Sequence, residues 1–283
     1  MKADRPSRTA HLVAFGRAVA DAGVTHVKGF RDPTAREFLT EKGERSLAKL
    51  EQLARQPNRG ARFEMTRSMG DLMALRTSAI DAAVRDAVAG GARQLVILGA
   101  GYDGRAWRMP ELAGVSVFEV DHPATQREKR ARVSKLPAAI GTVAFVPIDF
   151  ERESLANVLA MAGHNPAVPT CWIWEGVVMY LTRDAMRATL GAVAKWSAPG
   201  STLIVNYHTI VRRRLLAQII LMAIGEPQKS AWTPEQMAAD LDAAGFRVVD
   251  DTGMQDWNAR FAGGRARVDR SAYMRIAVAR TRA

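Results

Sequence analysis

The sequence predicts an α/β protein built around one mostly parallel β-sheet. Seven short runs rich in valine, isoleucine and leucine have the composition of strands that are buried on both faces. Segments with helical spacing of apolar residues lie between several of these runs, as at 184–199 and 234–245, and this alternation is typical of strand–helix–strand units. The predicted strands are residues 93–99, 115–121, 144–149, 170–176, 201–207, 246–251 and 274–280.

A glycine-rich turn follows the first predicted strand, in the segment 95–105 that reads LVILGAGYDGR. Gly99, Gly101 and Gly104 allow the backbone to approach a ligand closely. The next strand ends in Asp121, whose carboxylate can accept hydrogen bonds from both hydroxyls of a ribose. A buried strand, a tight glycine turn and an acid at the end of the next strand together indicate a nucleotide site. The alternative is a turn that serves only the path of the chain.

Asp103, within the turn, bears on which nucleotide would bind there. A pyrophosphate needs backbone N–H donors and no negative charge beside it, so a carboxylate here disfavours NAD. The same carboxylate would bind a cationic amino group or order water beside it. These properties favour a ligand with a ribose, an adenine and an amino-acid tail, and S-adenosyl-L-methionine has all three.

Four segments in consecutive order resemble those of a known family. They read LVILGAGYDGRAWRMP, VFEVDHP, VPIDFE and CWIWEGVVMYLT and begin at positions 95, 117, 146 and 171. With them, residues 60–283 resemble the leucine carboxyl methyltransferase-like family of class I S-adenosylmethionine-dependent O-methyltransferases. The resemblance implies a Rossmann-like sheet of seven strands with helices on both faces, an antiparallel last strand and an N-terminal helical lid. It also implies S-adenosyl-L-methionine as cofactor and, in the bacterial branch, small natural-product or lipid-like acceptors.

The resemblance also implies roles for residues at the carboxyl ends of the strands, where ligands collect in open α/β sheets. Gly99 and Gly101 would hold the methionine moiety, with Asp103 beside its ammonium group, and Asp121 would bind the ribose. Gly104 departs from the family, which more commonly has threonine there, so a hydroxyl that would stabilise the turn is absent.

Asp149 would accept a hydrogen bond from the adenine amine while Phe150 packs on the ring. Glu175 would lie close to the amino-acid end of the cofactor, and Arg76 would pair with the methionine carboxylate, a geometry that suits arginine. Each residue also has a simpler reading, because Asp121 and Asp149 could cap helices and Arg76 could be a surface charge. The predicted cofactor-binding residues are Arg76, Gly99, Ala100, Gly101, Asp103, Asp121, His122, Asp149, Phe150 and Glu175.

The methyl acceptor decides whether a general base is needed. A carboxylate acceptor is already ionised at neutral pH, whereas a hydroxyl acceptor needs a base, which is usually histidine. His208, after the fifth predicted strand, is a candidate base or substrate anchor, and a structural role is the alternative. Tyr180 and Tyr207 are candidates for hydrogen bonds to the acceptor oxygen. No histidine, cysteine and carboxylate cluster has the spacing of metal ligands, so no metal is expected.

Three regions are expected along the chain. Residues 1–75 form an N-terminal helical region that is either a lid over the active site or a cap that buries core. Residues 76–283 form the cofactor-binding core, with an insertion at about 208–232 that is either a substrate-facing flap or a core helix.

The net charge of +11 raises nucleic acid and anionic surfaces as partners, since a basic protein attracts both. However, the basic residues are scattered apart from the cluster 212–214, so a small-molecule acceptor and no nucleic acid is expected.

The longest apolar stretch, 215–225, is too short to span a membrane. The start of the chain has no apolar segment typical of a signal peptide. The single cysteine, Cys171, cannot form a disulfide within the chain, which is typical of proteins in a reducing cytoplasm. We expect it to be an inert buried thiol. A homodimer is left open.

Two other classes of function are compatible with the cofactor motifs. A non-catalytic cofactor-binding regulator would keep the glycine turn and the two aspartates but lack a substrate cavity. A nucleic-acid methyltransferase would use the positive charge, but it usually has an Asn/Asp-Pro-Pro-aromatic motif after the fourth strand. The sequence there reads WEGVVMYL, which argues against this class.

Overall fold

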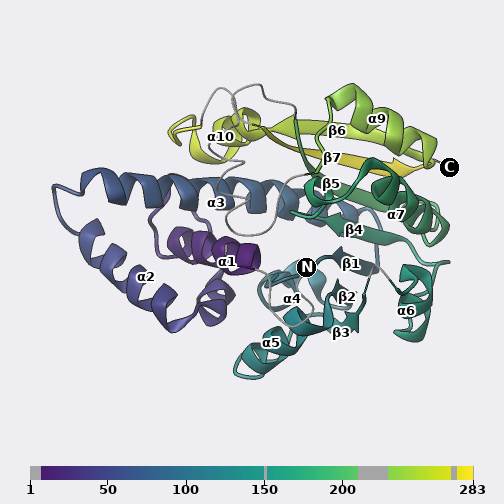
Figure 1. Ribbon diagram of the computed structural model, residues 1–283, viewed down its shortest axis with the longest axis horizontal. Coiled ribbons are helices and arrows are strands. Elements are labelled where there is room, and N and C mark those ends of the chain that lie inside the picture. Colours follow the sequence, from purple (N-terminus) through teal and green to yellow (C-terminus); the bar gives the residue numbers. More distant parts are fainter. Residues whose placement is uncertain (1–7, 150–151, 210–228, 269–272, 283) are drawn as a thin grey trace.

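The computed structural model describes residues 8–149, 152–209, 229–268 and 273–282. Seven strands form one sheet in the order β3-β2-β1-β4-β5-β7-β6 (Figure 1). Neighbouring strands are parallel except at β7, which runs antiparallel between β5 and β6. The strands are β1 (Gln94–Leu98), β2 (Ser116–Asp121), β3 (Thr142–Pro147), β4 (Thr170–Trp174), β5 (Thr202–His208), β6 (Phe246–Gly253) and β7 (Met274–Thr281).

The predicted strands are confirmed, and each end lies within two residues of its expected position. The antiparallel last strand is confirmed as well. The central strands β1, β4 and β5 could be read from the sequence because all their residues are buried, so that their apolar runs stand out from the polar segments around them.

Helices cover both faces of the sheet. One large apolar cluster joins the sheet to α3, α4 and α10, and a second joins its other face to α6, α7 and α9. The helices are α1 (Arg8–Asp21), α2 (Glu41–Ala54), α3 (Gly60–Ala89), α4 (Arg105–Arg108), α5 (Pro123–Val133), α6 (Leu155–Met161), α7 (Arg183–Lys195), α9 (Pro234–Ala243) and α10 (Met254–Ala262), with short 3-10 helices η1 (Pro33–Phe38), η2 (Pro110–Leu112) and η3 (Val178–Tyr180).

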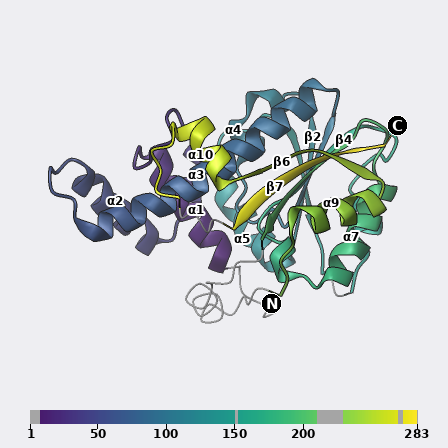
Figure 2. The same ribbon diagram turned by 90° about the horizontal axis from the view of Figure 1, so that it is seen from above.

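The N-terminal helices α1 and α2 lie to one side of the sheet and pack on the first half of α3 (Figures 1 and 2). They share a small apolar core of their own, which includes Val19, Leu47 and Phe63. The second half of α3 packs on the sheet through residues such as Ile80 and Val84. The expected boundary between residues 75 and 76 therefore falls inside one continuous helix, because α3 contributes to both cores.

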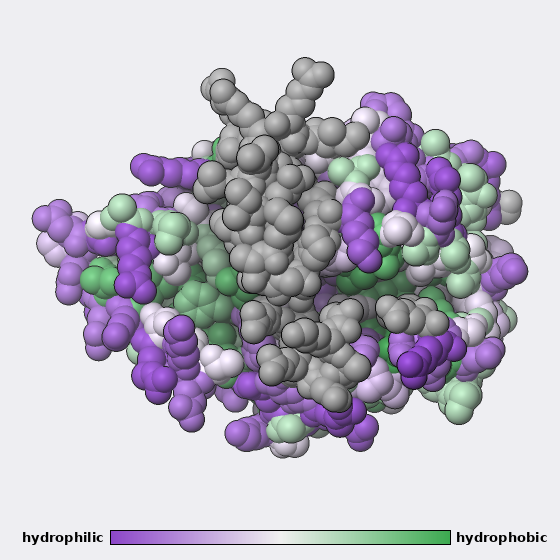
Figure 3. Space-filling model, in the orientation of Figure 1, coloured by the Kyte–Doolittle hydropathy of each residue, from purple (hydrophilic) through white to green (hydrophobic). Residues whose placement is uncertain are grey.

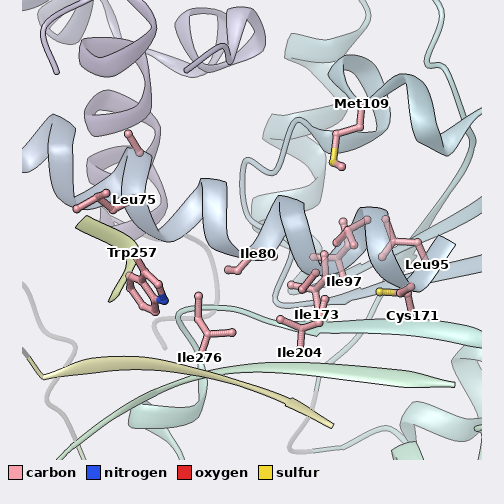
Figure 4. Close-up of a cluster of buried hydrophobic side chains, with 14 of the residues drawn as sticks. Leu75, Ile80, Leu95, Ile97, Met109, Cys171, Ile173, Ile204, Trp257 and Ile276 are labelled. Carbon is pink, nitrogen blue, oxygen red and sulfur yellow. The ribbon is translucent and has the colours of Figure 1, made fainter. Parts of the chain in front are cut away.

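The apolar cluster under α3 contains the single cysteine (Figure 4). Cys171 is fully buried in β4 beside Ile173 and Leu95. Burial raises the pKa of its thiol to about 12, so the thiolate is scarce at neutral pH. The expectation that the thiol is buried is confirmed. In the described parts of the chain, no helix combines the length and the apolar character that crossing a membrane requires.

Candidate active site

The strand order places the candidate site at one edge of the sheet. Moving outward from the centre, β1 is followed by β2 and β3 on one side and by β4 and β5 on the other. Ligands of open α/β sheets bind in the crevice at such a reversal, beyond the carboxyl ends of the strands. The glycine turn follows β1, Asp121 ends β2 and Glu175 follows β4, so these predicted positions share that edge.

The glycine turn after β1 is held tightly against its neighbours. Gly99 and Gly101 have φ of +70° and +49°, in the left-handed region that favours glycine. A Cβ atom at Gly99 would also lie 2.4 Å from Val177 Cγ2, well inside contact distance. The N–H groups of Gly99 and Ala100 both donate to the Val120 carbonyl, at 2.8 and 3.0 Å. The turn therefore has little freedom to take another shape.

The Asp121 carboxylate joins the turn to the end of β2. It accepts hydrogen bonds from the backbone N–H of Gly101 and, at 2.5 Å, from that of His122. Burial raises the pKa of Asp121, although both hydrogen bonds act in the opposite direction. His122 caps α5 instead, because its Nδ1 accepts from the Ala124 N–H at 3.3 Å. The reading of Asp121 as a helix cap is therefore wrong.

Four arginines and four carboxylates form a buried charge network behind the turn. Every side chain in it is at most 12% exposed, so water screens these charges weakly. The eight charges cancel, and the members come from α1, the start of η1, α3, the glycine turn, α4 and the segment after β4. Its ion pairs are Arg17–Asp32, Asp32–Arg108, Arg108–Asp81, Asp81–Arg105, Arg105–Asp103, Arg105–Glu175 and Glu175–Arg76.

Arg105 is the centre of the charge network and is fully buried. Its guanidinium donates to Asp81 at 2.8 Å, to Glu175 at 3.1 Å and to Asp103. The second oxygen of Asp103 accepts from the backbone N–H of Arg105 at 2.8 Å. Burial would raise the pKa of Asp103, but the charges of Arg105, Lys129 and Arg17 and the backbone hydrogen bond together lower it to about 2, and Arg105 contributes most among them.

Asp103 lies inside the protein, against Arg105. Its side chain is only 6% exposed and both of its oxygens are engaged by Arg105. Its charge is thus neutralised inside the protein by Arg105, and its place beside the ammonium group of the cofactor stays a prediction.

Arg76 and Glu175 form an ion pair at the edge of the sheet, with 2.7 Å between Nε and Oε1. Arg76 comes from α3 and is 5% exposed, so its reading as a surface charge is wrong. Burial would raise the pKa of Glu175, but Arg76 and Arg105 lower it below its usual value. Glu175 therefore stays ionised at neutral pH and presents a fixed negative charge beside a fixed positive one.

Asp149 follows β3 at the same edge and is more open than Glu175. Its side chain is 37% exposed and its carboxylate lies 3.7 Å from Arg152. Its backbone N–H donates to Glu153 Oε2 at 2.8 Å. Phe150 lies outside the described residues, so its predicted packing on an adenine ring stays a prediction, as does the role of Asp149.

The acceptor-side candidates lie in different environments. Tyr207 is fully buried in the sheet core and its hydroxyl donates to Asp251 at 2.7 Å, so the prediction that it contacts the acceptor is wrong. His208 comes next in β5 and faces the other side of the sheet because side chains alternate along a strand. Its ring packs edge-on to Tyr273, with 4.7 Å between ring centroids. Tyr180 ends η3 and is half-buried.

A second buried ion pair lies close to Asp121. Lys129 Nζ is 2.5 Å from Glu119 Oε2, and both side chains are at most 1% exposed. Lys129 also acts to lower the pKa of Asp121, so it is a nearby counter-charge for that carboxylate. The sequence contained a signal for the place of Glu119 beside Asp121, because it precedes Asp121 by two residues and shares its side of β2.

Among the described residues, no group of three or more His, Cys, Asp and Glu side chains could hold a metal ion.

Comparison with known proteins assigns the family. The family model for leucine carboxyl methyltransferase matches residues 10–194 of this chain. The chain belongs to the leucine carboxyl methyltransferase family. Membership places it among the S-adenosylmethionine-dependent methyltransferases. A relative from Frankia alni, named as an S-adenosyl-L-methionine-dependent methyltransferase, is 34% identical over 224 residues, which cover 77% of this chain and 75% of the relative.

Solved structures share the fold of this methyltransferase family member at low sequence identity. A DUF574 family protein from Streptomyces avermitilis aligns with a TM-score of 0.61 and 14% identity, covering 98% of each chain. A Thermobifida fusca protein assigned as a methyltransferase aligns with a TM-score of 0.56 and 18% identity, covering 99% of this chain and 96% of that one. At this identity the likeness concerns the fold alone, and it agrees with the class I methyltransferase sheet expected from the sequence.

Proposed function

We propose that this protein transfers a methyl group from S-adenosyl-L-methionine to an oxygen atom of a small-molecule acceptor, a carboxylate or a hydroxyl. The observation that carries the proposal is the pairing of two fixed features at one edge of the sheet. One is the Asp121 carboxylate bound to the glycine turn, and the other is the Arg76–Glu175 ion pair after β4.

The donor residues fit the cofactor by charge and hydrogen-bonding capacity. Glu175 can accept from the ammonium group of a methionine moiety, and Arg76 can donate to its carboxylate, so the ion pair complements a zwitterion. Asp121 is an acceptor-only group when ionised, which suits the two hydroxyls of a ribose. Burial raises the pKa of Asp121 in spite of its two backbone donors, so additional donors from a ligand would stabilise its charge.

Bound S-adenosyl-L-methionine supplies a methyl group on a sulfonium, which an acceptor oxygen can attack in line with the sulfur. The residues of this chain orient the two partners and exclude water, which are the main contributions to such a transfer. We favour a carboxylate acceptor slightly over a hydroxyl, because the carboxylate needs no proton removed. For a hydroxyl acceptor, His208 is the candidate base, since it lies at the end of β5, which neighbours β4.

Apolar surface supports an acceptor with an apolar body. The face in Figure 3 shows apolar side chains on both sides of the grey segment, toward the N-terminal helices and toward the sheet. Leu12 on α1 is 51% exposed. We therefore propose a natural-product or lipid-like acid as substrate, with residues 1–75 as the region that covers the site. The insertion expected at about 208–232 falls mostly outside the described residues.

We also propose that the reaction takes place in the cytoplasm, as part of secondary metabolism. The single cysteine, Cys171, is a free buried thiol. It forms no disulfide within the chain, as is usual for proteins of a reducing compartment.

Calorimetric titration with S-adenosylmethionine and S-adenosylhomocysteine tests the proposal first. Binding of both is expected, and no binding by folded protein would refute the cofactor assignment. Transfer of a labelled methyl group to panels of carboxylic acids and of alcohols and phenols then tests the acceptor. Mild alkali separates the products, because methyl esters release methanol whereas methyl ethers do not. Label found on added nucleic acid instead would contradict the small-molecule proposal.

The variant His208→Ala divides the two acceptor classes. If His208 is the base for a hydroxyl acceptor, the variant should lose about a hundredfold or more in rate. If the acceptor is a carboxylate, the rate should hardly change. A similar loss for both classes would mean that His208 positions the substrate rather than removing a proton.

A further inference from the structure

Gly104 is a glycine for a reason different from that of the other glycines in the turn. Its φ of −111° and ψ of 5° can be adopted by residues that have a side chain. However, a Cβ atom at this position would lie 1.8 Å from Thr34 Oγ1 and 3.0 Å from Thr34 Cβ. The N-terminal region therefore occupies the space that a side chain in the turn would need.

Thr34 cannot easily move away from this contact. It lies in η1, is 4% exposed, and its hydroxyl donates to Asp32 Oδ1 at 2.6 Å. Asp32 is fully buried and its other oxygen faces Arg17 at 3.3 Å and Arg108 at 3.7 Å. A shift of the threonine side chain would leave a buried carboxylate short of a donor, which is costly.

The N-terminal region contacts the glycine turn at further points. Arg17 donates to the Tyr102 carbonyl at 2.5 Å, and the Phe38 ring stacks on the Tyr102 ring with 5.1 Å between centroids. A Cβ atom at Gly101 would lie 3.4 Å from the Ala10 Cβ. The turn is thus packed between β2 and the N-terminal region.

The charge network extends this contact to the proposed cofactor site. Asp32 pairs with Arg108, which shares Asp81 with Arg105, and Arg105 pairs with Glu175. Arg105 directly follows Gly104 in the chain. A displacement of the backbone at this glycine would therefore also move Arg105, whose guanidinium pairs with Glu175. In a close-packed interior such a displacement is transmitted to neighbouring groups.

From this arrangement we propose that Thr34 is a positioning residue of the cofactor site. Its side chain fills the space over Gly104 and, through Asp32 and the charge network, holds Arg105 and Glu175 in the arrangement that receives the cofactor's amino-acid end. The N-terminal region is then a fixed wall of the cofactor site and not a cover for the acceptor alone. The inference rests on the proposed function, which assigns Glu175 to the cofactor.

Titration with S-adenosylhomocysteine tests the proposal in the full-length protein, together with the thermal midpoint of the ligand-free form. Thr34→Val keeps the shape but removes the hydroxyl, and we expect it to weaken binding about tenfold or more. Thr34→Ser keeps the hydroxyl and should bind like the wild type. Thr189→Val is the matched control, because its hydroxyl donates to the Ala185 carbonyl at 2.9 Å on α7, outside the charge network.

A double-mutant cycle separates positioning from general stability. Gly104→Ser alone should weaken binding because its Cβ meets Thr34, and Thr34→Gly alone should weaken it because Asp32 loses its donor. The double variant should bind better than either single variant. A Cβ at position 104 would lie 3.3 Å from Asp32 Oδ1, so a serine hydroxyl there can reach the same carboxylate.

The outcomes are distinct. If the wild type does not bind S-adenosylhomocysteine, the proposed function fails, whatever the variants do. If the wild type binds and Thr34→Val and Gly104→Ser both bind within about twofold of it, the positioning role is overturned. It is also overturned if the variants lose thermal stability without a change in affinity, or if the double variant is no better than the singles. Weakened binding by both singles, with recovery in the double variant and in Thr34→Ser, supports it.

Discussion

The variant Arg105→Met tests whether the charge network stabilises the fold. Methionine fills much of the same volume with an unbranched apolar chain, so the variant removes the charge and its hydrogen bonds more than the packing. Asp81 would keep Arg108 and Glu175 would keep Arg76, but Asp103 would lose its guanidinium partner at one oxygen. Its other oxygen would keep the hydrogen bond from the backbone N–H of residue 105.

The magnitude follows from burial. Arg105 is fully buried and Asp103 is 5% exposed, and removal of one partner from a buried pair costs about 3–5 kcal/mol. Arg85 provides a matched control, because its pair with Glu111 has a similar distance of 2.7 Å but side chains that are 48% and 35% exposed. Arg85→Met should therefore cost no more than about 1 kcal/mol of the free energy of unfolding.

Urea unfolding followed by tryptophan fluorescence measures both variants against the wild type. A loss in Arg105→Met that is no greater than that in Arg85→Met would refute the stabilising role of the network.

The pH dependence of the stability of Arg105→Met gives a second check. Arg105 is the strongest of the charges that lower the pKa of Asp103 against its burial, so its removal raises that pKa and shifts the carboxyl toward the protonated form. Folding of Arg105→Met would then take up a proton, so its deficit should shrink as the pH falls from about 7 to 5.

Three further predictions concern single residues. Asp121→Ala should weaken S-adenosylhomocysteine binding by about 1–3 kcal/mol, and unchanged affinity by calorimetry would remove Asp121 from the site. Gly99→Ala should lower the thermal midpoint and the affinity together, because alanine at φ +70° is strained and its Cβ meets Val177 at 2.4 Å; a variant with wild-type stability and affinity would contradict this. Burial lowers the pKa of His164 to about 4, so its contribution to stability is present above the usual pKa of about 6.5 and is lost between that pH and about 4. His164→Gln should therefore lose less stability than the wild type over this interval, and parallel unfolding curves at each pH would count against it.

The fold could be predicted because its signals are local in the sequence. Strands such as β1 and β4 are buried along their whole length, so they appear as continuous apolar runs. The first half of α3 gave a weaker signal, because its buried residues are divided between two cores and it shows no single apolar face. A 30-residue helix was therefore not expected there.

The candidate site could be predicted in part. The positions of the glycine turn, Asp121 and Glu175 follow from strand order, because the carboxyl ends of parallel strands meet at one edge. Tyr207 was misplaced because a residue at a strand end can face either side of the sheet. Helices cover both faces here, and in the structure Tyr207 is buried in the apolar cluster that joins the sheet to α6, α7 and α9.

The partners of the charged residues could not be predicted. Asp103 was expected to face a ligand, yet it pairs with Arg105, and Arg76 pairs with Glu175, which lies 99 positions further along the chain. An ion pair depends on distances between atoms after folding, and residue types and their spacing do not fix those distances across elements.

The sequence by itself determined the α/β sheet, the methyltransferase family and the positions along the chain from which the cofactor site is built. The sheet follows from apolar runs, the site positions from a glycine turn and acids at strand ends, and the family from the resemblance of four segments, all of which are properties of short stretches of sequence. Only the tertiary structure decided that Thr34 lies over Gly104 and that eight charged side chains from six parts of the chain form one neutral network. Such contacts join segments that lie far apart in sequence, and close packing in the interior sets them.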